Sequence, residues 1–471
     1  MGTDCKPAQL RFQGWGEGRR REVCLDFSGG RLSADGGGIL LAELERRRGI
    51  LRRFSECFVD HRDPSWVEHS VESLVAQRVL GLALGYEDLV DHEELRSDPL
   101  LASIVGVADA LGRKRRQERD RGKPLAGKST LNRFEWGAVS DAAEDRYRRI
   151  AWRPEAIEDL LIDLFLETLG KHPKRIVLDF DATDDPVHGE QERRFFHGYY
   201  GHYCYLPLYV VSGDSVLWAL LRPSNIDASK GSVEALQRIV SRIRRRFPRV
   251  EILVRADSGF AREELMAWCE ANAVDYLLGL ARNSRLESAL KKELARATQL
   301  HSQTGRPARC FRDFRYETCS SWSRKRRVVG KAEVLTQGPN PRFVVTSLTK
   351  AEIAAGALYD LYCQRGEMEN RIKEQQLDLF AGRTSAHAFA VNQLRLWLST
   401  FAYTLLAELR RLGLGGTSWA RAQCGTIRLK LLKIGAQVHL SVRRLWVSLS
   451  SAYPWKEIFL DALARLRASP A

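Results

Sequence analysis

The stretch Ile176-Val177-Leu178-Asp179-Phe180-Asp181-Ala182-Thr183 is an apolar run that ends in carboxylates. Its length and composition predict a buried strand, with Asp179 and Asp181 on one face because strand side chains alternate. A second stretch repeats the pattern, since Ile252-Leu253-Val254-Arg255-Ala256-Asp257-Ser258-Gly259 also ends in an aspartate before a turn. One strand-end aspartate is usually a cap or turn residue. Two of them in one basic chain favour a shared acidic edge.

The sequence around these two stretches predicts the rest of a sheet. Short β-rich runs separated by Gly, Asp and Pro come first, and helices then alternate with strands. This order predicts a mixed α/β sheet of the ribonuclease H-like kind. The predicted strands are Arg175–Asp181, Cys204–Ser212, Val216–Leu221, Val250–Ala256 and Asp275–Leu280, and the predicted helices are Val233–Arg246 and Arg262–Ala271.

The remaining segments flank or interrupt this core. We expect a mostly helical DNA-binding region over residues 1–170, the first part of the core over 171–281, and a β-rich insertion over 282–349. The second part of the core follows over 350–409, with a helix at Ala351–Leu377, and a helical region over 410–471. Within the first region, one helix is expected at Ser140–Thr168.

Composition narrows the class of partner. The 471 residues carry a formal net charge of +15, with a pI near 9.5, which favours a polyanion. The nine cysteines are scattered and never form a C-x-x-C pair, so neither a disulfide framework nor a zinc ribbon is expected. No signal segment or membrane span is evident. We therefore expect a soluble, cytoplasmic, nucleoid-associated protein without a membrane partner.

One motif invites a different function. Gly122-Lys123-Pro124-Leu125-Ala126-Gly127-Lys128-Ser129 matches the nucleotide-binding pattern G-x-x-x-x-G-K-S/T letter for letter. That loop needs a buried strand in front of it, and the highly charged residues 111–121 cannot supply one. We reject an ATPase and expect Ser129 or Thr130 to cap a short helix instead.

A third acidic residue lies on the helix Ala351–Leu377. At 100° per residue, one narrow polar stripe of this helix consists of Tyr362, Arg365, Glu369, Lys373 and Gln376. The stripe lies beside an apolar arc, and this arrangement is typical of a helix at the rim of a cleft. An exposed face with ion pairs one turn apart is the alternative. Asp181, Asp257 and Glu369 could together hold two Mg²⁺ ions, because hard cations prefer oxygen ligands.

These segments resemble a known family. Tyr362-x2-Arg365-x3-Glu369 resembles the Y-R-E-K signature of DDE transposases from bacterial insertion sequences, and Asp181-Ala182-Thr183 and Arg255-Ala256-Asp257 resemble its D-x-T and R-A-D segments. The likeness covers about Lys174 to Leu409 and is nearest to DDE domain group 1. The lysine that the signature carries beyond the glutamate is Gln376 here, so Lys373 is the expected substitute.

The resemblance implies a metal-dependent enzyme that binds terminal inverted repeats, cuts them and joins them to target DNA as a homodimer. It implies Asp181, Asp257 and Glu369 as catalytic metal ligands, with two Mg²⁺ ions for which Mn²⁺ substitutes. The residues expected to contact DNA are Tyr362, Arg365, Lys373, Arg324, Lys325, Arg326 and Arg327.

Several alternatives stay open at this point. The first ligand is Asp181 or Asp179, and we choose Asp181 because it stands beside Thr183. Trp322 is a core residue or a base-stacking wedge, and the aromatic run Phe195–Tyr203 stacks on DNA or packs as a hairpin. A ribonuclease H-like nuclease, or an element-derived DNA-binding protein without transposition, would share the fold.

Overall fold

The computed structural model describes residues 10–13, 22–137, 148–441 and 443–468. The chain divides into two compact units. Unit 1 combines residues 1–55, 60–134 and 408–471, so the two ends of the chain belong together. Unit 2 consists of residues 56–59 and 135–407, and it holds the predicted core up to residue 407 together with the insertion.

Unit 2 is built on a mixed sheet. In the described part of the chain, nine strands join in the order β11-β10-β6-β12-β13-β17-β15-β14, with β16 beside β15. The strands β6, β12 and β13 run parallel, and the other neighbours pair antiparallel. The first five strands in this order have the ribonuclease H-like topology, so the predicted fold class is confirmed. Their bounds are β6 Arg175–Ala182, β10 Leu208–Ser212, β11 Ser215–Leu220, β12 Glu251–Ala256 and β13 Asp275–Leu280.

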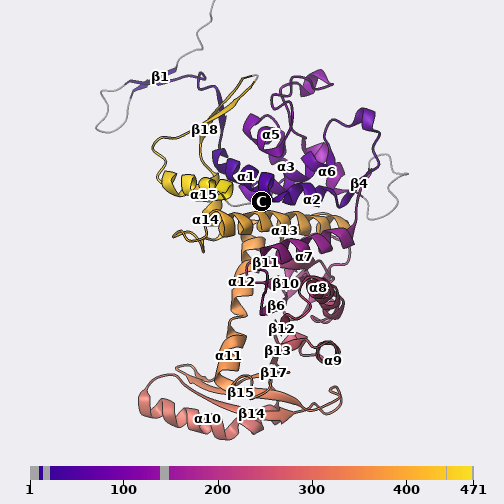
Figure 1. The fold of residues 1–471 in the computed structure, drawn as a ribbon, viewed down its shortest axis with the longest axis vertical. Helices are drawn as coiled ribbons and strands as arrows, with labels where there is room; N and C mark the ends of the chain where they lie inside the picture. The colour runs from indigo at the N-terminus through magenta and orange to yellow at the C-terminus, as the bar shows by residue number, and fades with distance from the viewer. Residues whose placement is uncertain (1–9, 14–21, 138–147, 442, 469–471) are drawn as a thin grey trace, which may run out of the picture. The chain divides into compact units, whose positions relative to one another are not determined.

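Alternating side chains give the sheet two buried faces. Ile176, Leu178 and Phe180 of β6 enter one apolar cluster, which α7 (Pro154–Thr168), α8 (Ser232–Arg246), α9 (Glu263–Ala271) and α10 (Ser284–Thr304) cover. A smaller cluster on the other face packs against α11 (Ala355–Cys363). Figure 1 shows α11 and α12 (Gly366–Lys373) along one side of the sheet and α8 and α9 along the other. The odd-numbered side chains of β6, which include both aspartates, therefore face α11 and α12.

The predicted β-rich insertion extends the sheet. Its strands are β14 Ala308–Tyr316, β15 Arg326–Leu335, β16 Gly338–Pro339 and β17 Arg342–Thr346. Leu277 of β13 pairs with Thr346 of β17, so the insertion continues the core hydrogen-bond ladder. The long helix α10 packs on β14 and β15. Small strands complete the unit, namely β4 Phe58–Asp60, β5 Ile150–Trp152, β7 Asp185–Pro186, β8 Phe195–His197 and β9 His202–Tyr205.

Unit 1 is mostly helical, with strands from both ends of the chain. Its elements are β1 Leu10–Gln13, β2 Glu22–Leu25, β3 Arg31–Ser33, α1 Ile39–Arg48, α2 Ile50–Ser55, α3 Val71–Leu84, α4 Asp91–Leu95, α5 Pro99–Val105, α6 Lys128–Glu135, α14 Cys424–Ile427, β18 Ala436–Leu440, β19 Leu445–Leu449 and α15 Lys456–Ala468. The prediction that residues 410–471 are helical was wrong for β18 and β19. These strands form a hairpin, and β18 also pairs with β3 from the other end of the chain.

Two predicted helices differ from the observed ones. The helix expected at Ser140–Thr168 begins at Pro154, with a strand at Ile150–Trp152 before it, while residues 140–147 lie outside the described range. The helix expected at Ala351–Leu377 consists of α11, α12 and a π-helical turn at Glu374–Asp378. The long apolar helix α13 spans Phe389–Leu412. Of the described helices, none has the length and apolar character that spanning a membrane requires.

Candidate active site

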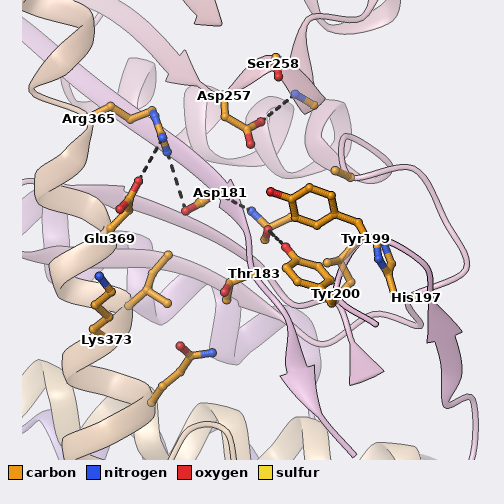
Figure 2. Close-up of a pocket in the computed structure, with 16 residues that line it drawn as sticks. Asp181, Thr183, His197, Tyr199, Tyr200, Asp257, Ser258, Arg365, Glu369 and Lys373 are labelled. Carbon is orange, nitrogen blue, oxygen red and sulfur yellow. Dashed lines mark hydrogen bonds and ion pairs between the residues drawn. The ribbon is translucent and has the colours of Figure 1, made fainter. Parts of the chain in front are cut away.

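A pocket of about 500 Å³ opens where β6 and β12 end. Asp181 and Asp257 line it from the two strand ends, and Glu369 lines it from α12. These three residues come from segments far apart in the sequence, and the sequence analysis had selected all of them. Figure 2 shows Asp181 between Asp257 and Glu369, with Arg365 above Glu369.

Asp181 is a largely enclosed carboxylate. Its side chain is 16% exposed, and the amide of Ala182 donates a hydrogen bond of 3.0 Å to its Oδ1. Burial raises the pKa of Asp181 to about 6, and the charges of Asp257 and Glu369 add to this rise while Arg365 opposes it. A carboxylate in this position gains most from a nearby positive charge.

Asp179 lies on the same face of β6 but has a different role. Register places it opposite Arg255 of β12, whose guanidinium donates two hydrogen bonds of 2.7 Å to its carboxylate. Both side chains are less than 10% exposed. Arg255 also donates to the carbonyl of Leu361 at 2.7 Å, which ties the sheet to α11. The oxygens of Asp179 are therefore engaged in a buried ion pair, outside the pocket lining.

Asp257 stands at the end of β12, where the chain turns sharply. Its Oδ1 accepts a hydrogen bond of 2.8 Å from the amide of Gly259, which holds the carboxyl group at the start of a short 3-10 turn. Ser258 and Gly259 line the pocket beside it. A strand end and a capped turn thus fix the second carboxylate from both sides.

Arg365 is the pocket cation that lies nearest to the carboxylates of Asp181 and Glu369. It stands at the N-cap of α12, one helical turn before Glu369, and its Nη2 lies 3.2 Å from Glu369 Oε1. Its Nη1 lies 3.8 Å from Asp181 Oδ2 and, among the described residues, has no hydrogen-bond partner. Lys373 and Gln376 line the same pocket further along the chain. Four residues of the predicted polar stripe therefore line the pocket together with Asp181 and Asp257, namely Arg365, Glu369, Lys373 and Gln376.

The donor set suits a hard divalent cation, although the oxygens are not gathered around one point. Across the described parts of the chain, no group of three or more His, Cys, Asp and Glu side chains is close enough to hold a metal ion. The guanidinium of Arg365 supplies the positive charge between Asp181 and Glu369. Carboxylate oxygens are the ligands that Mg²⁺ prefers, so the chemistry of the residues fits such an ion.

Comparison with known proteins identifies the family. Residues 16–471 match the family described as Transposase DDE domain group 1. The chain belongs to this family. It is a DDE transposase, an enzyme of DNA phosphoryl transfer, and such enzymes depend on divalent metal ions.

Other comparisons are more distant. No curated protein matches the transposase significantly. Among solved structures it is similar to a piggyBac transposase synaptic complex with hairpin DNA. The identity is 12% over 93% of this chain and 83% of that chain, with a TM-score of 0.42.

A glycine that the sequence analysis missed lies under Tyr362 and beside Ser258 of the transposase pocket. A Cβ on Gly279 of β13 would lie 2.6 Å from the hydroxyl of Tyr362 and 2.9 Å from the amide of Ser258. Tyr362 therefore reaches over the strand only because residue 279 has no side chain. A glycine inside a strand marks close approach of another segment, and this was the available signal.

The predicted DNA-contacting cluster at residues 324–327 is only partly available. Arg326 is 2% exposed and forms ion pairs with Glu263 at 2.6 Å and Glu270 at 2.7 Å. Hydrogen bonds from Arg326 lower the pKa of Glu263 to about 2. Arg327 is 5% exposed and pairs with Asp313 at 2.7 Å. The prediction that these two arginines contact DNA is corrected, because their guanidinium groups are engaged inside the fold.

The other two members of that cluster remain at the surface. Arg324 and Lys325 keep 61% and 65% of their side chains exposed, in ion pairs of 2.9 and 3.6 Å. Trp322 is 9% exposed and meets Tyr316 edge to face at 5.7 Å, which confirms the core alternative for this residue. The surface of the insertion thus offers two exposed cations from the predicted four.

The segment of the transposase that matches the nucleotide-binding sequence pattern does not form a phosphate-binding loop. The amides that would hold a phosphate are already used, since Ala126 donates to Gln77 Oε1 at 3.0 Å and Lys128 donates to Glu93 Oε1 at 2.7 Å. A carboxylate at the start of α6 repels phosphate. The expected cap was wrong, because the helix begins at Lys128 and Ser129 and Thr130 lie inside its first turn.

Replacing Lys128 by alanine is expected to leave activity unchanged and independent of ATP. The side chain of Lys128 is exposed, and the amides of Ala126 and Lys128 already donate hydrogen bonds to side chains of the fold. Equilibrium binding of a fluorescent ATP analogue to wild type and variant checks this. Tight binding to the wild type that the substitution removes would contradict the assignment.

Proposed function

We propose that this DDE transposase moves a bacterial insertion sequence by a cut-and-paste route, and that Asp181, Asp257 and Glu369 are its catalytic carboxylates. One observation carries the proposal. Three carboxylates from three separate elements line a single pocket, together with an arginine that lies 3.8 Å from Asp181 and 3.2 Å from Glu369. A structural role for all three at once would leave this concentration of negative charge unexplained.

The three carboxylates are the proposed ligands of two Mg²⁺ ions, with Mn²⁺ as a substitute. When bound, such ions activate the attacking hydroxyl and stabilise charge on the leaving oxygen. The raised pKa of Asp181 supports this role. Ionising a buried carboxyl group alone is unfavourable, whereas a bound cation beside it makes the ionisation favourable. Asp179 is left out of the ligand set, since Arg255 already occupies both of its oxygens.

The remaining pocket residues are proposed to hold the DNA. Arg365 offers a guanidinium whose Nη1 has no hydrogen-bond partner among the described residues, and a planar fork can grip two phosphate oxygens. Lys373 is exposed on the next turn of α12 and serves as the lysine of the signature. Tyr362, Arg324 and Lys325 complete the proposed contacts. The net charge of +15 supplies long-range attraction to a DNA backbone.

The proposed partners are the terminal inverted repeats of the element and a target duplex, bound by a homodimer. The helical parts of unit 1 within residues 1–170 are proposed to recognise the repeats, and residues 171–281 and 350–409 to cut them. In the cell we propose a cytoplasmic, nucleoid-associated enzyme.

Cleavage and joining of paired ends test the function directly. DNA segments from both sides of the gene are incubated with the protein and a target plasmid, in Mg²⁺, in Mn²⁺ or in EDTA. We expect nicked ends and joined products with either metal and none in EDTA. Cleavage without joining would indicate a nuclease. Binding without either reaction would indicate an element-derived DNA-binding protein, and both results would overturn the proposal.

A further inference from the structure

The hairpin of β8 and β9 is held firmly at its base. The hydroxyl of buried Tyr205 donates a hydrogen bond of 2.6 Å to the carbonyl of Glu192. The hydroxyl of Ser224 donates one of 3.0 Å to the carbonyl of Phe195. At the turn, the amide of Gly201 donates a hydrogen bond of 2.8 Å to the carbonyl of His197, and the hydroxyl of Tyr200 lies 3.5 Å from the carbonyl oxygen of Ala182 at the end of β6.

The tip of this hairpin carries aromatic rings into the pocket lining. Tyr200 lies 4.8 Å from His197 and 5.0 Å from Tyr199 between ring centroids, and all three residues line the pocket. Tyr199 is nevertheless 87% exposed. Figure 2 shows the rings on one side of Asp181, with Arg365 on the other.

The ring of Tyr199 is both restrained and open. One edge of the ring packs perpendicular to Tyr200, at 84°, while most of its surface stays uncovered. A restrained aromatic ring loses little conformational freedom when a ligand stacks on it. The hairpin thus combines a packed side, where Cys204 and Tyr205 are fully buried, with an open aromatic tip.

The charge of the pocket indicates what kind of ligand suits this ring. Asp181, Asp257 and Glu369 repel phosphate, so an uncharged contact beside them holds a nucleotide without adding charge. Every base has a flat π surface that stacks on aromatic side chains. In a duplex both surfaces of a base are covered by its neighbours, and only a base that has left the stack is free for Tyr199.

We propose that Tyr199 stacks on an unpaired base next to the phosphodiester that is cut in the pocket. This rests on the proposed function and adds a positioning residue to it. The stacked base anchors its nucleotide, so the adjoining phosphate stays beside the carboxylates. Tyr200 and His197 act through Tyr199 by supporting its ring.

The test combines a spectroscopic and a kinetic measurement. End DNA carries 2-aminopurine at each terminal position in turn, because its fluorescence rises when it leaves the duplex and falls when it stacks on an aromatic ring. Tyr199→Leu keeps apolar bulk without a ring, and Tyr199→Trp enlarges the ring. At one position we expect brighter fluorescence in the Leu complex than in the wild-type complex. Cleavage is expected to fall about tenfold in Leu, the loss of one stacked base, and to stay near wild type in Trp.

Two controls separate stacking from a merely structural effect. Phe196→Leu changes an exposed ring on the same hairpin that packs on Tyr203 at 5.7 Å and lies outside the pocket lining, so it should keep wild-type cleavage and quenching. End DNA with an abasic site at the identified position should abolish the difference between wild type and Tyr199→Leu. A difference that persists on abasic DNA would overturn the proposal.

The fluorescence measurement is repeated in the Asp181→Ala background, where no cleavage is expected. Loss of quenching on adding Tyr199→Leu there supports stacking whether or not the pocket cuts DNA. Equal fluorescence with and without the ring overturns it, even if the wild type proves an active transposase. Absence of cleavage by the wild type would instead count against the proposed function.

Discussion

Replacing Asp181 by alanine is expected to abolish metal-dependent cleavage while leaving the fold intact. A bound metal contributes several kcal/mol to phosphoryl transfer, so losing one ligand should slow cleavage by on the order of a thousandfold or more. Asp257→Ala and Glu369→Ala should have the same effect. Binding of end DNA should survive in all three, because the charge that attracts DNA is spread over the chain.

The stability of the Asp181 variant has a definite expected sign. Burial raises the pKa of Asp181 to about 6, above its value in the unfolded chain, so the folded protein binds the proton more tightly. Stability from this group is present at low pH and falls as the pH rises through 4 to 6. At neutral pH the ionised carboxylate is a burden, and alanine should leave the melting temperature equal or higher.

Asp179→Ala is the matched control, and it is expected to lower the melting temperature of the protein without removing a metal ligand. It removes one partner of a buried ion pair and leaves the guanidinium of Arg255 without its two carboxylate hydrogen bonds. Such a change costs about 3–5 kcal/mol. Thermal melting together with cleavage rates distinguishes the two aspartates. Full cleavage by the Asp181→Ala variant would contradict the assignment of Asp181. Loss of cleavage without loss of stability in Asp179→Ala would likewise assign the first ligand to residue 179.

Arg365→Lys is expected to cleave DNA roughly 10- to 100-fold more slowly, the loss of one charge-assisted hydrogen bond. Lysine keeps the positive charge between Asp181 and Glu369 but loses the planar fork that can hold two phosphate oxygens. Raising the Mg²⁺ concentration should not restore the rate, since the defect lies in the grip on DNA.

A structural role for Arg365 makes a different prediction. Its ion pair with Glu369 joins residues one helical turn apart, and Glu369 is 48% exposed, so this pair stabilises the helix only weakly. If Arg365 served only to hold α12, Arg365→Lys would keep most of the activity and Arg365→Ala would melt earlier. Cleavage rates and melting temperatures of both variants decide between the two roles.

Local pattern was enough to predict the sheet. The apolar runs that end in Asp181 and Asp257 became β6 and β12, with their carboxylates at one pocket. Strand alternation could not choose between Asp179 and Asp181, because it puts both on one face. The proposed choice of Asp181 rests on the register of β12, which sets Arg255 opposite Asp179. The register between two segments that are distant in sequence cannot be predicted from either segment alone.

The errors have a similar origin. A run of four cations looks like a surface patch, but Arg326 and Arg327 meet acidic residues on α9 and β14 that their own neighbourhood does not reveal. The strand β18 was missed although β19 follows it in a local hairpin, and its second partner, β3, lies at the opposite end of the chain. Conversely, the positions of Asp181 and Asp257 at strand ends could be predicted, because each depends only on where an apolar run of the sequence ends.

The order of the three carboxylates along the chain has a consequence for synthesis on the ribosome. Asp181 and Asp257 are synthesised well before Glu369. The insertion strands lie between Asp257 and Glu369 in the sequence, so they must be made first and added to the sheet. A nascent or prematurely terminated chain therefore holds an incomplete acidic set. With Asp181, Asp257 and Glu369 as the proposed ligands, such a fragment is expected to have no cleavage activity, because the proposed ligand set is complete only once the core has been translated through α12.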